Sequence, residues 1–146
     1  MENRVYLITV YVDNLLIFAS NDELKQIEQA FTEEFCWITM EIGKVHSYLC
    51  MQLDFMNDGV RIDMTFYLDK ILNEFPDLKE EELPGKKDLF VIDKKAVALS
   101  ERAGRFFHTI MAKILYLSWR ARLDIITSIG FLCMRVKAPT ETMIGS

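Results

Sequence analysis

Residues 5–19 read VYLITVYVDNLLIFA, and this stretch decides how the first part of the chain folds. Val, Ile, Leu, Tyr and Phe fill nearly every position on both sides of Asp13 and Asn14. Branched and aromatic side chains favour strands, and a polar pair between two such runs favours a turn. The stretch therefore predicts a β-hairpin that turns at Asp13 and Asn14. Because both strands are so apolar, we expect both faces of the hairpin to be covered.

A helix and further strands are predicted after this hairpin. Residues 20–22 read SND and supply N-cap side chains. Apolar side chains follow at helical spacing, at Leu24, Ile27, Phe31 and Phe35. They predict an amphipathic helix that lies on the hairpin. Strands are predicted over residues 48–53 and 60–64, on either side of the turn residues 57–59, NDG.

The rest of the chain reads as helical. Residues 65–75 predict a short helix that Pro76 ends. Residues 77–99 are charged and contain Pro84-Gly85, which is typical of a linker. Ser100 is expected to cap a long helix that ends near Arg122, and a second helix is predicted from about residue 124 to 137. The predicted fold class is therefore α+β, with parts at 1–76, 77–99 and 100–146.

Composition excludes several classes of protein. Of the 146 residues 51% are apolar, so the chain is globular rather than disordered. No apolar run approaches the ~20 residues of a membrane span, and the first residues lack the pattern of a signal peptide. The three cysteines, Cys36, Cys50 and Cys133, lack metal-ligand spacing and indicate reduced thiols. We therefore expect an intracellular protein of the cytoplasm or nucleus, with no membrane partner.

Charge is divided unevenly along the chain. Residues 1–99 hold ten Lys and Arg against nineteen Asp and Glu, a balance of −9, whereas residues 100–137 have a balance of +5. On a helical wheel, four cations of the long helix fall within about 80° of one another. They are Arg102, Arg105, Lys113 and Arg120, and are here called the basic ridge. A basic ridge suits a polyanionic partner, but it is equally typical of a solvated helix face.

Five segments resemble one known family in order and spacing. Residues 11–14, YVDN, resemble the Tyr-x-Asp-Asp signature of reverse transcriptases. Residues 43–55, GKVHSYLCMQLDF, are similar to a Gly-Lys-Val-His stretch before Tyr-Leu-Gly-Met in copia-type retrotransposon polyproteins. The later blocks are YLDKIL at 67–72, FHTIMAKILYL at 107–117 with RARLDI at 120–125, and RVKAPTE at 135–141. The resemblance covers nearly all of the chain.

The resemblance implies an RNA-directed DNA polymerase, a nucleotidyltransferase. Two Mg²⁺ or Mn²⁺ ions ~3.5–4 Å apart would steady the attacking and leaving oxygens, with Asp13 as catalytic residue and metal ligand. Residues 1–76 would be a partial palm of antiparallel hairpins with a packed helix, and residues 100–146 a thumb-like lobe. The partners implied are an RNA template–DNA primer duplex and the remaining polymerase segments of the polyprotein. The basic ridge would grip the duplex, and Tyr48 and Met51 would either face the primer or belong to the core.

The chain also departs from the family pattern. Asn14 stands where the family has its second aspartate, Cys50 replaces a glycine, and Leu123 replaces a proline. The resemblance assigns the fingers and a further metal-binding aspartate to segments that precede this one. We therefore expect the isolated chain to be inactive and its metal binding to be weak or absent. The alternative is a non-catalytic, transposon-derived interaction module, in which Asp13 is an ordinary turn residue.

Overall fold

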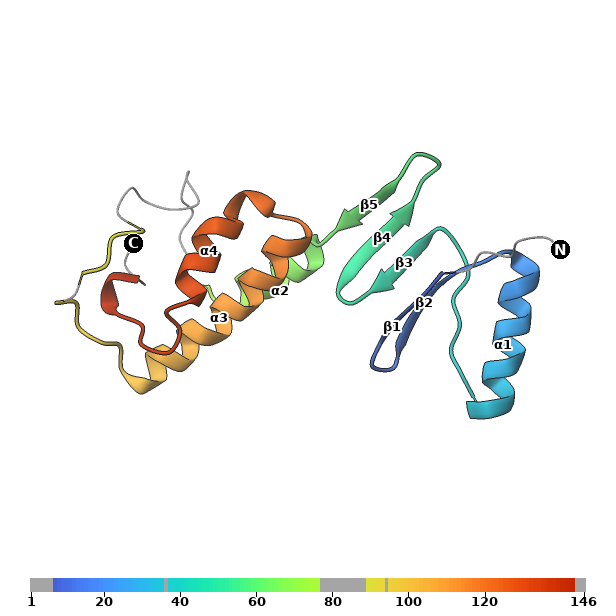
Figure 1. Ribbon diagram of the computed structural model, residues 1–146, viewed down its shortest axis with the longest axis horizontal. Helices are drawn as coiled ribbons and strands as arrows, with labels where there is room; N and C mark the ends of the chain where they lie inside the picture. The colour runs from blue at the N-terminus through green and yellow to red at the C-terminus, as the bar shows by residue number, and fades with distance from the viewer. Residues whose placement is uncertain (1–6, 36, 77–88, 94, 144–146) are drawn as a thin grey trace. The chain divides into compact units, whose positions relative to one another are not determined.

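The structure, a computed structural model, describes residues 7–35, 37–76, 89–93 and 95–143 (Figure 1). These residues form a mixed α+β fold with two small antiparallel sheets and four α-helices, which confirms the predicted class at that level. The strands are β1 (Leu7–Tyr11), β2 (Asn14–Phe18), β3 (Val45–Tyr48), β4 (Met51–Phe55) and β5 (Val60–Asp63). The α-helices are α1 (Asn21–Phe35), α2 (Thr65–Glu74), α3 (Glu101–Arg120) and α4 (Ile126–Cys133). The chain divides into two compact units, residues 1–61 and 62–146.

The β1–β2 hairpin confirms the first prediction and moves its turn by one residue. Leu7 pairs with Phe18 and Tyr11 pairs with Asn14, so the loop consists of Val12 and Asp13 alone. Asn14, predicted as a turn residue, is the first residue of β2. Val12 has a φ of 55°, in the left-handed region that branched side chains rarely adopt. The tight loop therefore holds a strained residue directly before Asp13.

The prediction that both faces of this hairpin are covered is wrong for the described residues. No residue of β1 or β2 is buried, and Val10 keeps 67% of its surface exposed. In unit 1, the single buried residue among those described is Leu53 of β4, at 6% exposure. Apolar residues at nearly every position of both strands predicted a covered hairpin, but no described element of unit 1 buries it. The strands described in unit 1 therefore form sheets without a buried core.

α1 begins with the predicted cap. The Ser20 hydroxyl oxygen accepts a hydrogen bond of 3.4 Å from the Glu23 backbone N–H, and the Glu23 carboxylate accepts one of 3.0 Å from the Ser20 backbone N–H. This reciprocal arrangement is a capping box, which satisfies free backbone donors at the helix start. However, α1 has no buried residue, and Phe35 is exposed. The apolar stripe of the helix, at Leu24, Ile27 and Phe31, is therefore only half-buried.

The second sheet has strand order β3-β4-β5 and contains a turn that the sequence analysis missed. Tyr48 pairs with Met51, so Leu49 and Cys50 form a two-residue loop inside the stretch that was predicted as one strand. Their φ angles are 49° and 62°, the pattern of a type I′ turn. Asn-Gly is the usual signal for that turn, and this loop carries neither residue. The turn predicted at residues 57–59 is present, between β4 and β5.

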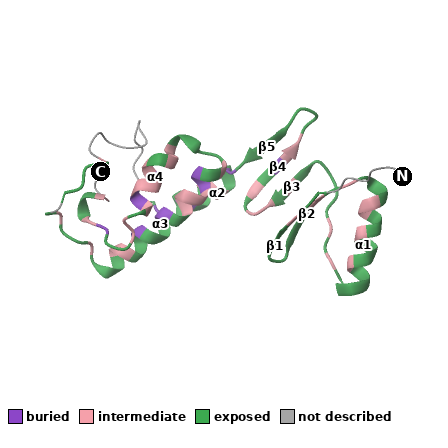
Figure 2. Cartoon of the chain, in the orientation of Figure 1, coloured by how far each residue is buried: buried purple, intermediate pink, exposed green. Residues whose placement is uncertain are grey.

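Unit 2 is built on α3. Ser100 caps this helix by accepting a hydrogen bond from the Ala103 N–H, as predicted, although the helix ends at Arg120. The buried cluster joins α2, α3 and α4 and consists of Ile71, Phe75, Phe107, Ile110, Met111 and Leu132. Figure 2 shows these buried positions on the three helices. α2 packs with α3 and belongs to unit 2.

The last part of unit 2 is less helical than predicted. Residues 124–137 were expected to form one helix, but a 3₁₀ turn (Leu123–Ile125) precedes α4, and turns follow Cys133. A second 3₁₀ turn spans Glu141–Met143. The predicted linker is only partly described, since residues 77–88, with Pro84-Gly85, and residue 94 lie outside the described residues. Its described end packs on the core through Leu89 and Leu99.

Replacing Cys50 by Gly should stabilise unit 1. A side chain at positive φ costs roughly 1–2 kcal/mol, and glycine removes that cost while adding entropy to the unfolded chain. We expect Cys50→Gly to raise the free energy of unfolding by about 1 kcal/mol in urea titrations followed by circular dichroism. Cys50→Ala is the matched control, because it removes the thiol and keeps the Cβ atom. Equal stability of the two variants would contradict the strain at this turn.

The open hairpin should make the chain associate with itself. Uncharged strand edges and exposed apolar faces favour pairing with other chains. We expect light scattering to show an apparent mass that rises with concentration, and Val10→Lys to bring it towards the monomer mass. Val97→Lys, at an exposed position of unit 2, is the control and should leave association unchanged. A parent chain that stays monomeric at high concentration would contradict this expectation.

Candidate functional site

Asp13 lies at the exposed tip of the β1–β2 hairpin. The two-residue loop fixes its position relative to two paired strands, and the preceding Val12 is 87% exposed. One carboxylate oxygen of Asp13 accepts a hydrogen bond of 2.9 Å from the side-chain amide of Asn14. The predicted catalytic residue and the degenerate metal position are therefore in contact. Their contact places an amide donor, rather than a second anion, beside the carboxylate.

These two side chains fit a divalent cation poorly. Mg²⁺ prefers six oxygen ligands and is usually held by one or two carboxylates together with substrate phosphates. In the described part of the chain, no three or more His, Cys, Asp or Glu side chains gather into a group that could hold a metal. Asp13 supplies one carboxylate, and the Asn14 amide nitrogen already faces it. Among the described residues, the hairpin tip therefore supplies a metal ion with one anionic ligand, Asp13, and not with a full set of ligands.

Tyr48 and Met51 face each other across the Leu49–Cys50 loop. Both side chains are half-buried. The Tyr48 hydroxyl lies 3.4 Å from the Thr9 hydroxyl, which joins the tip region of β3 to β1. Tyr48 and Met51 were interpreted either as primer contacts or as core residues. Partial burial fits both interpretations.

The structure places the four cations of the basic ridge on α3 but engages three of them within the chain. Arg105 forms an ion pair with Glu101, and Lys113 forms one with Glu74 of α2. The Arg120 guanidinium stacks 3.6 Å from the Tyr116 ring centroid and donates to the Tyr116 carbonyl. Arg102 is exposed. The ridge is therefore less available to phosphates than its charge suggests.

The sequence contained a signal for only one of these ion pairs. Glu101 and Arg105 are four residues apart on one helix, which is the spacing of a surface pair. Glu74 lies on another helix, so its approach to Lys113 depends on the packing of α2 against α3. Lys113 also lies 5.6 Å from the Phe75 ring centroid. Lys113 is therefore contacted by two neighbouring residues at the end of α2. The helical periodicity of α3 does not predict these contacts.

Further cations in the positive part of the chain are also engaged. Arg122 donates from two nitrogens to the two carboxylate oxygens of Asp124, over 2.9 Å and 2.8 Å. This hydrogen-bonded guanidinium holds the pKa of the Asp124 carboxyl below its usual value. Arg135 stacks on Phe131. The balance of +5 therefore overstates the free positive charge of residues 100–137.

The three thiols lie in different surroundings. Cys50 is exposed at the β3–β4 turn, whereas Cys133 is half-buried. Burial raises the pKa of the Cys133 thiol. Cys36 lies outside the described residues. None of the described helices is long and apolar enough to cross a membrane.

Comparison of the chain with protein-family models, with curated proteins and with solved structures finds no match.

Restoring the second carboxylate should tighten metal binding at the hairpin tip. A unit charge at about 4 Å contributes about 1 kcal/mol in water, and a divalent ion doubles that to about 2 kcal/mol, so we expect Asn14→Asp to raise Mn²⁺ affinity about 30-fold. Asn57→Asp, at another exposed turn, is the control with the same change of charge. Calorimetry should separate the two. Identical titrations for the parent and Asn14→Asp would mean that the tip forms no metal site.

Proposed function

We propose that the chain is the palm-hairpin and thumb portion of a copia-type reverse transcriptase, an RNA-directed DNA polymerase. In this proposal it contributes to holding a template–primer duplex and performs no nucleotidyl transfer by itself. The observation that carries the proposal is the two-residue loop that presents Asp13 between two uncharged, paired strands. A hairpin tip of this kind supplies a rigidly placed carboxylate, which a two-metal polymerase requires.

The chemistry at the tip supports a contributing role rather than complete catalysis. Phosphoryl transfer depends on positioning of nucleotide, metal and attacking hydroxyl. Bound Mg²⁺ or Mn²⁺ would supply electrostatic stabilisation of the transferring phosphoryl group. Asp13 provides one carboxylate towards such an ion, and Asn14 replaces the second with a neutral amide. In this proposal the described residues contribute one ligand to such a site and do not complete it.

The open surface of unit 1 supports a place within a larger polymerase. A sheet normally buries at least one face, and a two-stranded hairpin is marginally stable in water by itself. Here Leu53 is the single buried residue among those described in unit 1. The remaining polymerase segments are the partner that would cover the exposed strands. In this proposal the apolar composition of the hairpin serves that interface.

The α3 helix supports contact with the duplex backbone. Phosphate contacts are electrostatic and carry no sequence information, so a helix with several cations on one side suits them. Arg102 and Arg105 are exposed, while Lys113 and Arg120 are half-buried. Glu101 and Glu74 compete with phosphates for two of these cations. Binding is therefore expected to be weak, at or below the non-specific range of about 10⁻⁴–10⁻⁶ M.

A second candidate function is a non-catalytic interaction module derived from a transposon. The same exposed hairpin favours it, because an apolar sheet face is a protein-binding surface as well as an open palm. The engaged cations also favour it, since they leave less charge for nucleic acid. The two candidates differ in one measurable property, which is salt-dependent binding to an RNA–DNA hybrid.

Binding to a hybrid duplex should depend on the basic ridge and on its carboxylate competitors. Fluorescence anisotropy measures how the logarithm of the binding constant falls with the logarithm of salt concentration. We expect this slope to become shallower by about one unit for each cation removed. The double variant Arg102→Ala with Arg105→Ala should therefore lose about two units. Glu74→Gln with Glu101→Gln frees Lys113 and Arg105 and should tighten binding. Asp58→Asn with Glu141→Gln is the control, because it removes the same charge from two exposed carboxylates that form no ion pair with the ridge in the described part of the chain.

Two outcomes would contradict parts of this proposal. If both double variants keep the affinity and slope of the parent, the ridge is a solvated face and the interaction module is favoured. If the purified chain extends a primer on a template, and Asp13→Ala abolishes that extension, the chain is catalytic by itself.

A further inference from the structure

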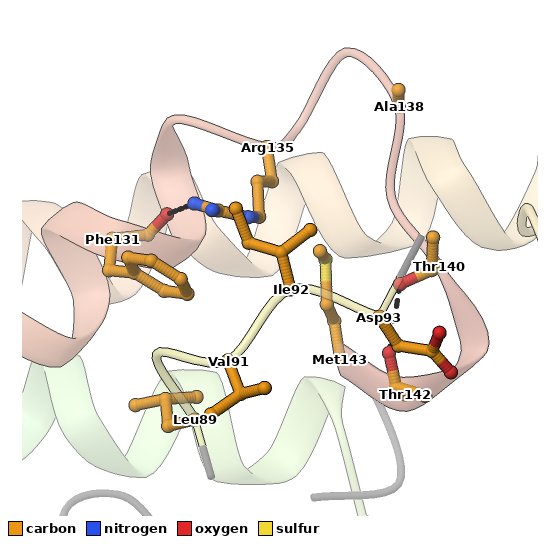
Figure 3. Close-up of a pocket in the computed structure, with 10 residues that line it drawn as sticks. All are labelled: Leu89, Val91, Ile92, Asp93, Phe131, Arg135, Ala138, Thr140, Thr142 and Met143. Atoms are coloured by element: carbon orange, nitrogen blue, oxygen red, sulfur yellow. Dashed lines mark hydrogen bonds between the residues drawn. The ribbon is translucent and has the colours of Figure 1, made fainter. Parts of the chain in front are cut away.

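A pocket of about 450 Å³ lies in unit 2, and no residue of the basic ridge lines it (Figure 3). Its walls come from residues 89–93, from the end of α4 and from residues 138–143. Leu89, Phe131 and Met143 belong to the layer that packs against the buried cluster of the three helices. Val91 and Ile92 form an exposed apolar rim, with Ile92 at 61% exposure. The volume lies within the usual range of small-molecule sites, about 300–1,000 Å³.

Several contacts fix the walls of this pocket. Ala98 and Thr140 form an antiparallel bridge, and the Leu99 N–H donates to the Pro139 carbonyl over 2.9 Å. The Phe90 ring meets the Phe131 ring edge-on at 5.0 Å, which ties the segment before the rim to α4. The pocket is therefore part of the packed structure of unit 2 rather than a gap beside a loose end.

One cation is held in a defined orientation at the pocket. The Arg135 guanidinium lies 3.6 Å from the Phe131 ring centroid, and its Nη1 donates to the Phe131 carbonyl over 3.1 Å. Figure 3 shows this hydrogen bond, with Arg135, Phe131 and Ile92 around the same space. The remaining guanidinium donors have no partner among the described residues. A planar fork held by stacking loses little freedom when it binds a carboxylate or phosphate.

The nearby carboxylate does not neutralise this cation. Asp93 accepts a hydrogen bond of 2.8 Å from the Lys95 N–H, so its side chain closes its own turn. Figure 3 shows the Asp93 carboxylate on the side of Thr142, at the opposite end of the pocket from the guanidinium. An anionic head at Arg135 and an apolar body along Leu89 and Ile92 would therefore match the pocket. Arg135, Asp93 and these apolar walls define an amphipathic site.

We propose that this pocket binds a small amphipathic oxyanion, with a carboxylate or phosphate head at Arg135 and an apolar tail along Leu89, Ile92 and Met143. The site is independent of the proposed polymerase role, because it uses neither the hairpin tip nor the basic ridge. Its ligand would stabilise the packed end of unit 2 by binding the folded state alone.

The test compares three compounds that share one tail, on the full chain. Decanoate has a carboxylate head and decyl phosphate a phosphate head. Decanol has the same tail with an uncharged hydroxyl and is the neutral control. We expect calorimetry to show at least one anion binding roughly 10- to 100-fold more tightly than decanol, the range of a charge-assisted hydrogen bond. The preferred anion identifies the head group. Arg135→Gln should remove the preference, whereas Lys137→Gln, an exposed cation two residues away, should keep it.

Methyl NMR on the parent chain locates the bound compound. This measurement does not depend on whether a variant folds. Decanoate should shift the methyl signals of Ile92 and Met143, and not those of Val10 and Leu15 in the exposed hairpin. Ile92→Trp fills the pocket from its exposed rim and should abolish binding without lowering the melting temperature. The proposal is overturned by equal binding of decanol, by shifts confined to the hairpin, or by unchanged binding in Ile92→Trp.

Discussion

The burial of α3 between α2 and α4 is the interaction on which the rest of the structure depends. Phe107 is 2% exposed, and it joins the cluster through which α3 contacts α2 and α4. Around this cluster the Tyr67 and Tyr116 rings, the Phe75 and Phe106 rings, and the Lys113–Glu74 ion pair complete the helix contacts. Apolar burial at roughly 25 cal/mol per Å² makes this cluster the main source of stability in unit 2. The pocket forms where residues 89–93, which precede α3, and residues 138–143, which follow α4, line the same space.

Unit 1 shows the opposite balance. Its hydrogen-bonded ladders and capping box are well formed, but backbone pairing contributes little net stability when apolar side chains stay in water. Phe18 and Phe55 meet edge-on at 5.3 Å, and this contact with the Thr9–Tyr48 pair links the two sheets. Such sparse contacts suit a surface that another protein segment completes. The apolar side chains of the hairpin stay exposed because no described residue of unit 1 covers them. The proposed function uses the same exposed surface.

Sequence reasoning predicted the elements with strong local signals and failed where the cause was remote or unusual. The strands β1 and β2, the cap at Ser100 and the helix α2 follow from periodicity and capping chemistry. The loop at Leu49 and Cys50 was missed because neither residue type favours positive φ. The pairing of Lys113 with Glu74 depends on helix packing, which helical wheels do not contain. For the site, Asp13 was placed at a turn correctly, while the pocket at Arg135 was not foreseen.

The three departures from the family pattern share a structural property. Asn14, Cys50 and Leu123 are all exposed, and each lies in or beside a turn. Substitutions at such positions change local charge or backbone strain while leaving a buried cluster intact. Asn14 lowers the negative charge at the hairpin tip, and Cys50 places a side chain at a φ of 62°. None of these three residues belongs to the buried cluster of unit 2, so changes at them leave the composition of that cluster unaltered.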